Sequence, residues 1–289
     1  MSRFDIYAPL NEFEWAGLDF QLSPALSLRR RSQRPDLRGL DASLAQDEQD
    51  TISLADHWLE FQWDEGTTPS PAETVNMILL AFWLAKPTKM HVAYRFELGC
   101  GSAVNTNKVC RLLDRFAWVP GTTHVALDDS DIEAAAVHNR VLRDLCRARG
   151  RLNDALVLTL VGCWSHRWQT ALISHAAAAE AILTYATGPG ITRRLSTTYA
   201  CLVEAQPADR DRAFREFVSL YAARSDIMHG RTHNVAPPDR LPTLARFEEI
   251  LRRLWRVVLS SPQLIHVLDD TDTQRQAWFA AREAGYSPP

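Results

Sequence analysis

The hydrophobic pattern of the chain changes near residue 129, from alternation in the first half to helical repeats in the second. Between Lys89 and Leu98 every second residue is a large apolar one, which predicts a half-buried strand. Leu59, Phe61 and Trp63 predict another. The apolar run Met77–Ala85 is followed by Lys86-Pro87-Thr88, so we interpret Met77–Ala85 as the hairpin partner of the Lys89–Leu98 strand.

Two further stretches of the first half are less regular. Phe20–Leu28 is read as a strand that Pro24 either confines to an edge or breaks. Arg29–Asp50 is polar, which favours loop or short helix. The first half, residues 1–128, is therefore expected to be a mixed α/β or β-rich domain.

The second half, residues 129–289, repeats its apolar positions at helical spacing and carries helix start and stop residues. Asp129-Ser130-Asp131 and Asp272 are candidate N-caps, and Gly150, Gly188-Pro189-Gly190 and Gly230 are candidate stops. The predicted helices are Ile132–Arg149, Ala155–Gly162, Trp168–Tyr185, Ile191–Glu204, Asp209–His229, Leu241–Leu259 and Thr273–Ala284. We therefore expect an α+β protein whose second domain is an all-α bundle.

Charge and cysteine content limit the function classes. The net charge of −3 and the pI near 6.3 give no overall field that attracts nucleic acid, so RNA binding would need a local basic patch. Five scattered cysteines without a Cys-x-x-Cys pair, and no signal-peptide segment, predict a reduced, soluble, cytoplasmic protein. Met77–Ala85 is too short to cross a bilayer. No residue cluster has convincing metal spacing, and we expect no cofactor.

The segment with most chemical potential is Tyr221-Ala-Ala-Arg224-Ser225-Asp226-Ile-Met-His229-Gly230. Histidine moves protons near neutral pH, and arginine holds charge on a phosphate. With 29 arginines and 9 histidines, chance gives about one Arg-x4-His match in such a chain. The context distinguishes this match: a tyrosine three residues before the arginine, a serine after it, and a helix-ending glycine after the histidine.

The segment of roughly residues 150–260 resembles the Apea-like HEPN domain family. The similarity rests on the Tyr221-to-Gly230 ending, on Glu180 within an alanine-rich helix, and on the Ile191-Thr-Arg-Arg-Leu-Ser196 helix after a glycine turn. The family is tied to prokaryotic toxins and antiviral defence. The resemblance implies a homodimer in which the Arg and His of both protomers line one cleft. It also implies a metal-independent endoribonuclease, a hydrolase that leaves 2′,3′-cyclic phosphate ends on RNA.

Helix geometry agrees with a shared cleft. Positions i and i+5 lie about 140° apart on an ideal helix, so one helix does not easily bring Arg224 and His229 to the same phosphate. A frayed end at Gly230, or a second protomer, would solve this. The chain departs from many catalytic HEPN motifs at Ser225, where Asn, Asp or His is common; serine is usual in the Apea-like branch.

Each candidate residue has a functional and a structural interpretation. His229 would act as general base or acid, or would merely complement the helix dipole. Arg224 would clamp the phosphate, or would form a salt bridge with Glu180 or Asp226. Glu180 is interpreted as a partner that orients Arg224, and Ser225 as a hydrogen-bond donor to phosphate. Asp226 would orient a histidine or face water. Tyr221 is interpreted as a residue of the core or of the dimer interface.

The rival hypothesis is a non-catalytic HEPN-fold dimer that binds RNA, a nucleotide or a partner protein. In the ribonuclease hypothesis the first domain would sense a trigger or hold the nuclease in check, and the sequence does not identify a regulatory partner. Four weaker candidates are read as loops or packing: Arg29–Arg31 with Arg34, Gly99-Cys100-Gly101-Ser102, Trp164 and Trp168 with His166, and Arg231 with His233.

Overall fold

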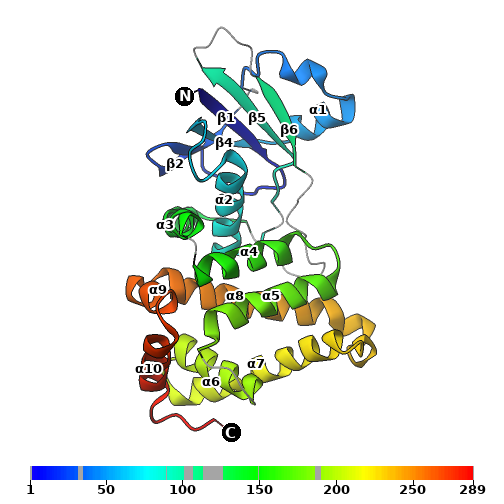
Figure 1. Ribbon diagram of the computed structural model, residues 1–289. Coiled ribbons are helices and arrows are strands. Elements are labelled where there is room, and N and C mark those ends of the chain that lie inside the picture. Colours follow the sequence, from blue (N-terminus) through cyan, green and yellow to red (C-terminus); the bar gives the residue numbers. More distant parts are fainter. Residues whose placement is uncertain are drawn as a thin grey trace. The chain divides into compact units, whose positions relative to one another are not determined.

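The computed structural model describes residues 2–31, 35–88, 90–100, 107–112, 126–148, 150–185 and 190–288. They form two compact units, of which the first ends at Arg147 and the second runs from Ala148 to the C-terminus (Figure 1). The first unit contains an antiparallel sheet and the second is helical, so the expected α+β class is confirmed.

The first unit is built on a six-stranded sheet of order β2-β3-β4-β1-β5-β6, in which all neighbours are antiparallel. Its strands are β1 (Arg3–Leu10), β2 (Asp19–Ser23), β3 (Leu26–Arg30), β4 (His57–Asp64), β5 (Tyr94–Cys100) and β6 (Lys108–Arg111). The alternation at Leu59, Phe61 and Trp63 correctly predicts β4. Pro24 does break the Phe20–Leu28 stretch, which forms β2 and β3 on either side of it.

The Met77–Ala85 prediction is wrong, because this run lies in helix α2 (Pro71–Ala85). A continuous apolar run fits a buried strand and a buried helix equally well. The residues before the run identify it as part of a helix. The Ser70 side chain accepts the Glu73 amide, the Glu73 carboxylate accepts the Ser70 amide, and Pro71 occupies the first turn. The Lys89–Leu98 strand is also shifted, since β5 begins only at Tyr94, and Lys89 itself lies outside the described residues.

Both faces of the sheet carry buried apolar side chains. Helix α1 (Gln46–Ser53) contributes Ile52 to a cluster with Trp58 and Phe96 on one face. On the other face, Phe13 links Phe82 of α2 to His57 of β4, at ring distances of 5.3 and 5.1 Å. The polar stretch Arg29–Asp50 includes the end of β3, a short 3₁₀ turn (Leu40–Ser43) and the start of α1.

Helix α3 (Asp129–Arg147) belongs to the first unit, whereas we predicted it to open the helical domain at residue 129. The reason is burial: Ile132, Leu142 and Leu145 are covered as α3 packs along α2, which is itself almost entirely apolar. The N-terminal cap of α3 is Asp128, whose carboxylate accepts the Asp131 amide at 3.0 Å.

The second unit is a helical bundle close to the predicted pattern. It comprises α4 (Arg151–Trp164), α5 (Trp168–Leu183), α6 (Ile191–Val203), α7 (Pro207–Met228), α8 (Arg240–Leu259), α9 (Pro262–Leu268) and α10 (Asp272–Glu283). Helix α9 was not predicted. Thr271, rather than Asp272, caps α10 through its side chain. Gly188 and Pro189 of the predicted turn lie outside the described residues. Within the described part, no helix is long and apolar enough to cross a membrane.

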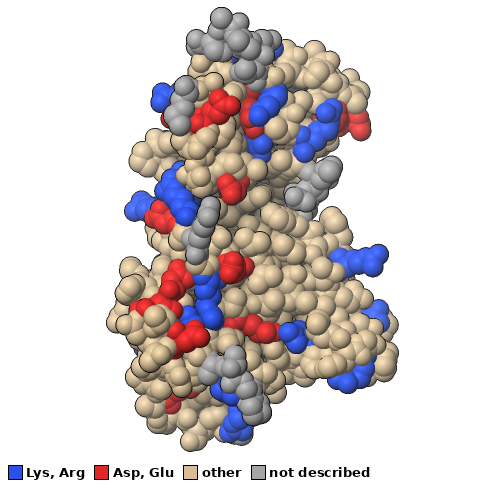
Figure 2. Space-filling model, viewed as in Figure 1, with Lys and Arg blue, Asp and Glu red and all other residues tan. Residues whose placement is uncertain are grey.

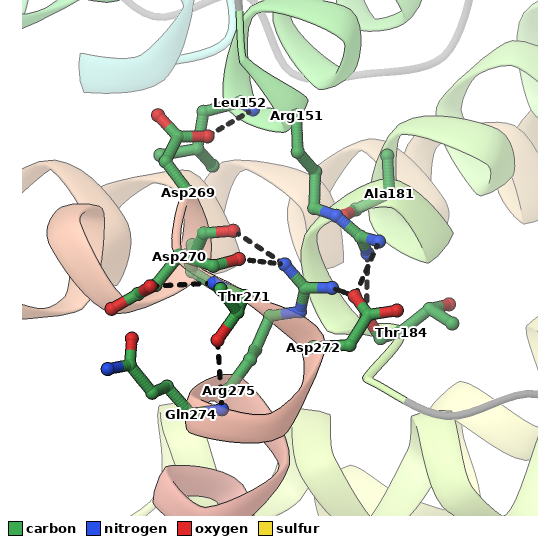
Figure 3. A network of polar contacts seen from close by, with 11 residues as sticks. Arg151, Leu152, Ala181, Thr184, Asp269, Asp270, Thr271, Asp272, Gln274 and Arg275 are labelled. Atoms are coloured by element: carbon green, nitrogen blue, oxygen red, sulfur yellow. Dashed lines mark hydrogen bonds and ion pairs between the residues drawn. The ribbon is translucent and has the colours of Figure 1, made fainter.

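A polar network holds four helix ends of the bundle together (Figure 3). Asp269 accepts the Leu152 amide at the start of α4, at 3.1 Å. Arg151 donates to the carbonyl oxygens of Ala181 and Thr184 at the end of α5. The buried Arg275 of α10 donates to the Leu268 carbonyl at the end of α9. Because each charge meets the helix end of opposite polarity, we assign this network a structural role.

Candidate functional site

The motif segment occupies the last turn of α7 and the residues that follow it. The helix ends in a Schellman motif: the Gly230 amide donates to the Ile227 carbonyl at 3.0 Å, and the Arg231 amide donates to the Asp226 carbonyl at 2.7 Å. Gly230 has φ of +72°, a conformation that costs other residues about 1–2 kcal/mol. The predicted glycine stop is therefore confirmed, and it fixes how the chain leaves the helix beside His229.

An apolar cluster anchors this helix end. Ile227 is buried against Ala171 and Leu172 of α5 and against Leu244 of α8. The start of α5, the end of α7 and the start of α8 therefore meet at one end of the bundle. His229 follows Ile227 by two residues, so its backbone is held by this packing, while its side chain is exposed.

Glu180 of α5 joins Arg224 and Tyr221 of α7. Its Oε1 accepts the Tyr221 hydroxyl at 2.7 Å and lies 2.9 Å from Arg224 Nη2. The Arg224 guanidinium lies over the Tyr221 ring, 5.3 Å from its centroid. The side chains of Arg224 and Glu180 are each 26% exposed, whereas Tyr221 is buried. Glu180 thus has the partner that its burial required, and Arg224 is oriented without being sealed from solvent.

This arrangement makes stability at high pH depend on Tyr221. Burial and the Glu180 carboxylate raise the pKa of the Tyr221 phenol, because both disfavour the phenolate. The neutral phenol therefore contributes stability below the ordinary value of about 10, and this contribution is lost as the pH rises towards the raised pKa. We expect Tyr221→Phe to cost about 1 kcal/mol at pH 8, and wild type to lose stability more steeply than this variant above pH 10. Urea unfolding from pH 8 to 11 measures both; parallel pH curves would refute the coupling.

Arg224 and His229 are not brought together within one chain. Arg224 contacts Glu180 and Tyr221, and the His229 imidazole has no hydrogen-bond partner among the residues that the structure describes. Arg224 Nε is buried and likewise has no hydrogen-bond partner there. The exposed His229 imidazole therefore keeps hydrogen-bonding capacity that the fold does not use.

Ser225 and Asp226 have different positions. The Ser225 carbonyl accepts the His229 amide at 3.1 Å, and its side chain is half-buried. Asp226 pairs with Arg231 at 2.9 Å; Asn234 and Arg231 hold the pKa of its carboxyl below the usual value. Asp226 thus fastens the segment after the helix and, in the described part of the chain, does not orient a histidine.

The packing gathers further basic side chains around this helix end. Arg167 precedes α5, Arg240 begins α8, and Arg231 and His233 lie in the connection between α7 and α8. Arg240 lies over the Trp168 ring at 5.6 Å, and Arg167 is exposed. Figure 2 shows several basic side chains, all of them arginines by sequence, at this end of the second unit. Arg167 and Arg240 could not be predicted from the sequence, because each is distant in sequence from the motif and only the tertiary fold brings it near.

The other candidates have structural explanations where they are described. Arg31 pairs with Glu60, and Arg29 pairs with Asp19 at 2.8 Å. Cys100 ends β5. Arg34, Gly101 and Ser102 lie outside the described residues. Trp168 packs at the edge of the Ile227 cluster, as expected for a helix face. Among the described residues, no group of three or more His, Cys, Asp or Glu is arranged to hold a metal ion.

A second polar group in the bundle is inaccessible. His175 of α5 is fully buried, with its Nε2 3.8 Å from Glu248 Oε1 of α8. A Cβ on Gly162 of α4 would lie 2.4 Å from the His175 ring, so α4 and α5 are in close contact there. We assign this group to packing, since no substrate can reach it.

No protein family model, no curated protein and no solved structure matches this chain.

Proposed function

We propose that the second unit is a metal-independent endoribonuclease of HEPN type, with Arg224 and His229 as its catalytic residues. The observation that carries this proposal is the end of α7. There an arginine oriented by Glu180 and Tyr221, and an exposed histidine without a partner among the described residues, lie where basic side chains gather. The family resemblance of the Tyr221–Gly230 segment supports the same reaction.

The chemistry assigns a task to each group. The ribose 2′-oxygen attacks the adjacent phosphorus and the bond from phosphorus to the 5′-oxygen breaks, which leaves a 2′,3′-cyclic phosphate and a 5′-hydroxyl. A histidine takes the proton from the 2′-hydroxyl, and an acid returns a proton to the departing 5′-oxygen. Arg224 stabilises the charge that develops on the phosphoryl oxygens.

This division of labour favours a homodimer. The two proton transfers need two groups at one phosphate, and each chain supplies one histidine in the motif. Arg224 and His229 also do not contact each other within a chain. A cleft between two copies of the second unit would combine their arginines and histidines, and RNA would bind along the basic end formed by Arg167, Arg231 and Arg240.

The biological setting that we propose follows from the resemblance: a cytoplasmic toxin or antiviral defence effector that is kept in check until triggered. The first unit would then sense the trigger or bind a regulatory partner. An unchecked ribonuclease harms its own cell, which is the reason to expect restraint.

A non-catalytic HEPN-fold dimer that binds RNA, a nucleotide or a partner protein is the second candidate. The observation in its favour is the pairing of Arg224 with Glu180, because an arginine held by a carboxylate has fewer donors left for a transition state. On this view Arg224 and Tyr221 are part of a structural network, and His229 only ends the helix.

The test is incubation of purified protein with total RNA in EDTA, with the ends of the products identified. Cleavage that leaves cyclic-phosphate and 5′-hydroxyl ends is the expected result. RNA that is bound but left intact would favour the binding dimer. If the protein neither cleaves nor binds RNA, that result contradicts the proposal. RNA affinity measured by fluorescence anisotropy separates these last two outcomes.

A further inference from the structure

The first unit contains a cavity of about 140 Å³, remote in sequence from the α7 motif. It is lined by the end of β4, by the loop before α2, and by the C-terminal half of α3. Its polar side chains include two arginines one helical turn apart, Arg143 and Arg147, and three threonines, Thr67, Thr68 and Thr74. Trp63 supplies an aromatic wall.

Among the residues that the structure describes, Arg143 has no counter-charge of the kind that a half-buried guanidinium normally has. Its Nε is buried without a hydrogen-bond partner, and the described part of the chain offers it no ion pair. Burial and the neighbouring Arg147 charge lower the pKa of Arg143. Desolvating a cation without a partner is costly, so we expect an anion to compensate the charge of Arg143.

The nearby acids do not compensate for this charge. Asp64 lines the cavity, but its carboxylate lies 2.9 Å from Arg3 Nε. Asp144 is adjacent in sequence, yet it pairs with Arg147 at 3.2 Å and is largely exposed. Arg147 also donates its Nε to the Thr68 carbonyl at 3.1 Å, which fixes it at the cavity. The cavity therefore has a surplus of positive charge.

The donors suit a tetrahedral oxyanion. Guanidinium groups form bidentate hydrogen bonds to phosphoryl oxygens. Arg143 and Arg147 lie four residues apart, so they share one face of α3. The Thr68 and Thr74 hydroxyls can donate to further oxygens; that of Thr67 already donates to the Asp64 carbonyl at 2.7 Å. A cavity of roughly 150 Å³ holds a molecule the size of benzene, so this one has room for a phosphoryl group and a few attached atoms. We propose that the cavity binds the phosphoryl group of a small phosphorylated ligand.

The test uses the full-length protein with inorganic phosphate and with adenosine 5′-monophosphate, each against sodium chloride at equal ionic strength. Both anions should raise the melting temperature of wild type and give a calorimetric binding signal. Arg143→Met should weaken this binding by at least about 10-fold, since it removes charge-assisted hydrogen bonds. Arg140→Met changes an exposed arginine of the same helix that does not line the cavity, and it should bind as wild type does.

Two further measurements keep the result unambiguous. Without phosphate, Arg143→Met should melt no lower than wild type, because it removes a half-buried charge that has no ion-pair partner among the described residues. Thr74→Val, which keeps the side-chain shape, should also bind phosphate more weakly than wild type. Tighter binding of the nucleotide than of phosphate would identify an ester as the ligand, and equal binding would identify free phosphate.

The proposal is overturned if neither anion stabilises wild type, or if Arg143→Met and Arg140→Met respond to phosphate alike. The second outcome would place any phosphate effect elsewhere, for example at Arg224. This proposal does not depend on the ribonuclease assignment, because its readouts are binding and melting rather than cleavage.

Discussion

His229→Ala is expected to lower the rate of RNA cleavage by about 10²–10⁴-fold, the usual contribution of general acid–base catalysis. The fold should tolerate the change, because the His229 side chain is exposed and has no hydrogen-bond partner in the described part of the chain. Its backbone amide, which donates to the Ser225 carbonyl, is retained in the variant. Single-turnover cleavage of a labelled RNA measures the effect.

The matched control for this change is His266→Ala. His266 is an exposed histidine of α9 in the same unit, outside the motif. The His266→Ala variant should cleave RNA at the wild-type rate. Equal rates for wild type and His229→Ala, with the RNA saturating, would remove His229 from the reaction. A lower melting temperature of His229→Ala would instead indicate a structural role.

Arg224→Ala is expected to lower cleavage by about 10²–10³-fold, the effect of deleting one group that stabilises transition-state charge. The variant should lose only about 1 kcal/mol of free energy of unfolding, since Glu180 is partly exposed and keeps its hydrogen bond from Tyr221. Arg224→Lys separates the two roles. A lysine can keep the ion pair with Glu180, but it cannot hold a phosphate in two-pronged fashion.

We therefore expect Arg224→Lys to unfold like wild type and yet to cleave slowly. Arg215→Ala, an exposed position of the same helix, should change neither property. Cleavage kinetics beside urea unfolding of the three variants measures both. If Arg224→Lys cleaved at the wild-type rate, Arg224 would serve only the ion pair, and the binding dimer would become the better account.

The sequence predicted those parts of the fold that local patterns determine. The alternation at Leu59, Phe61 and Trp63 suffices for β4, and Gly230 indicates the end of α7. Two further local signals in the sequence match elements of the structure. The Ser70-to-Glu73 capping box indicates a helix rather than a strand, and the alternating Phe4–Leu10 segment corresponds to β1.

Other features depend on tertiary packing and could not be predicted from the sequence. Arg167 and Arg240 join the motif only because α5, α7 and α8 meet around Ile227. Helix α3 joins the first unit because α2 needs cover for its apolar surface, a fact that no period in α3 itself reveals. From the sequence, either Glu180 or Asp226 could pair with Arg224. The structure selects Glu180 because α5 packs against α7, whereas Asp226 turns to Arg231.

The central claim is that two copies of the chain build one cleft with Arg224 and His229. The most direct measurement is the cleavage rate of a fixed amount of wild type as an Arg224→Ala/His229→Ala double variant is added and exchanged into dimers. The account predicts a progressive fall in rate, because each wild-type chain then faces an inactive partner. A rate that stays constant while mixed dimers form would show that each chain acts alone, and would contradict the shared cleft.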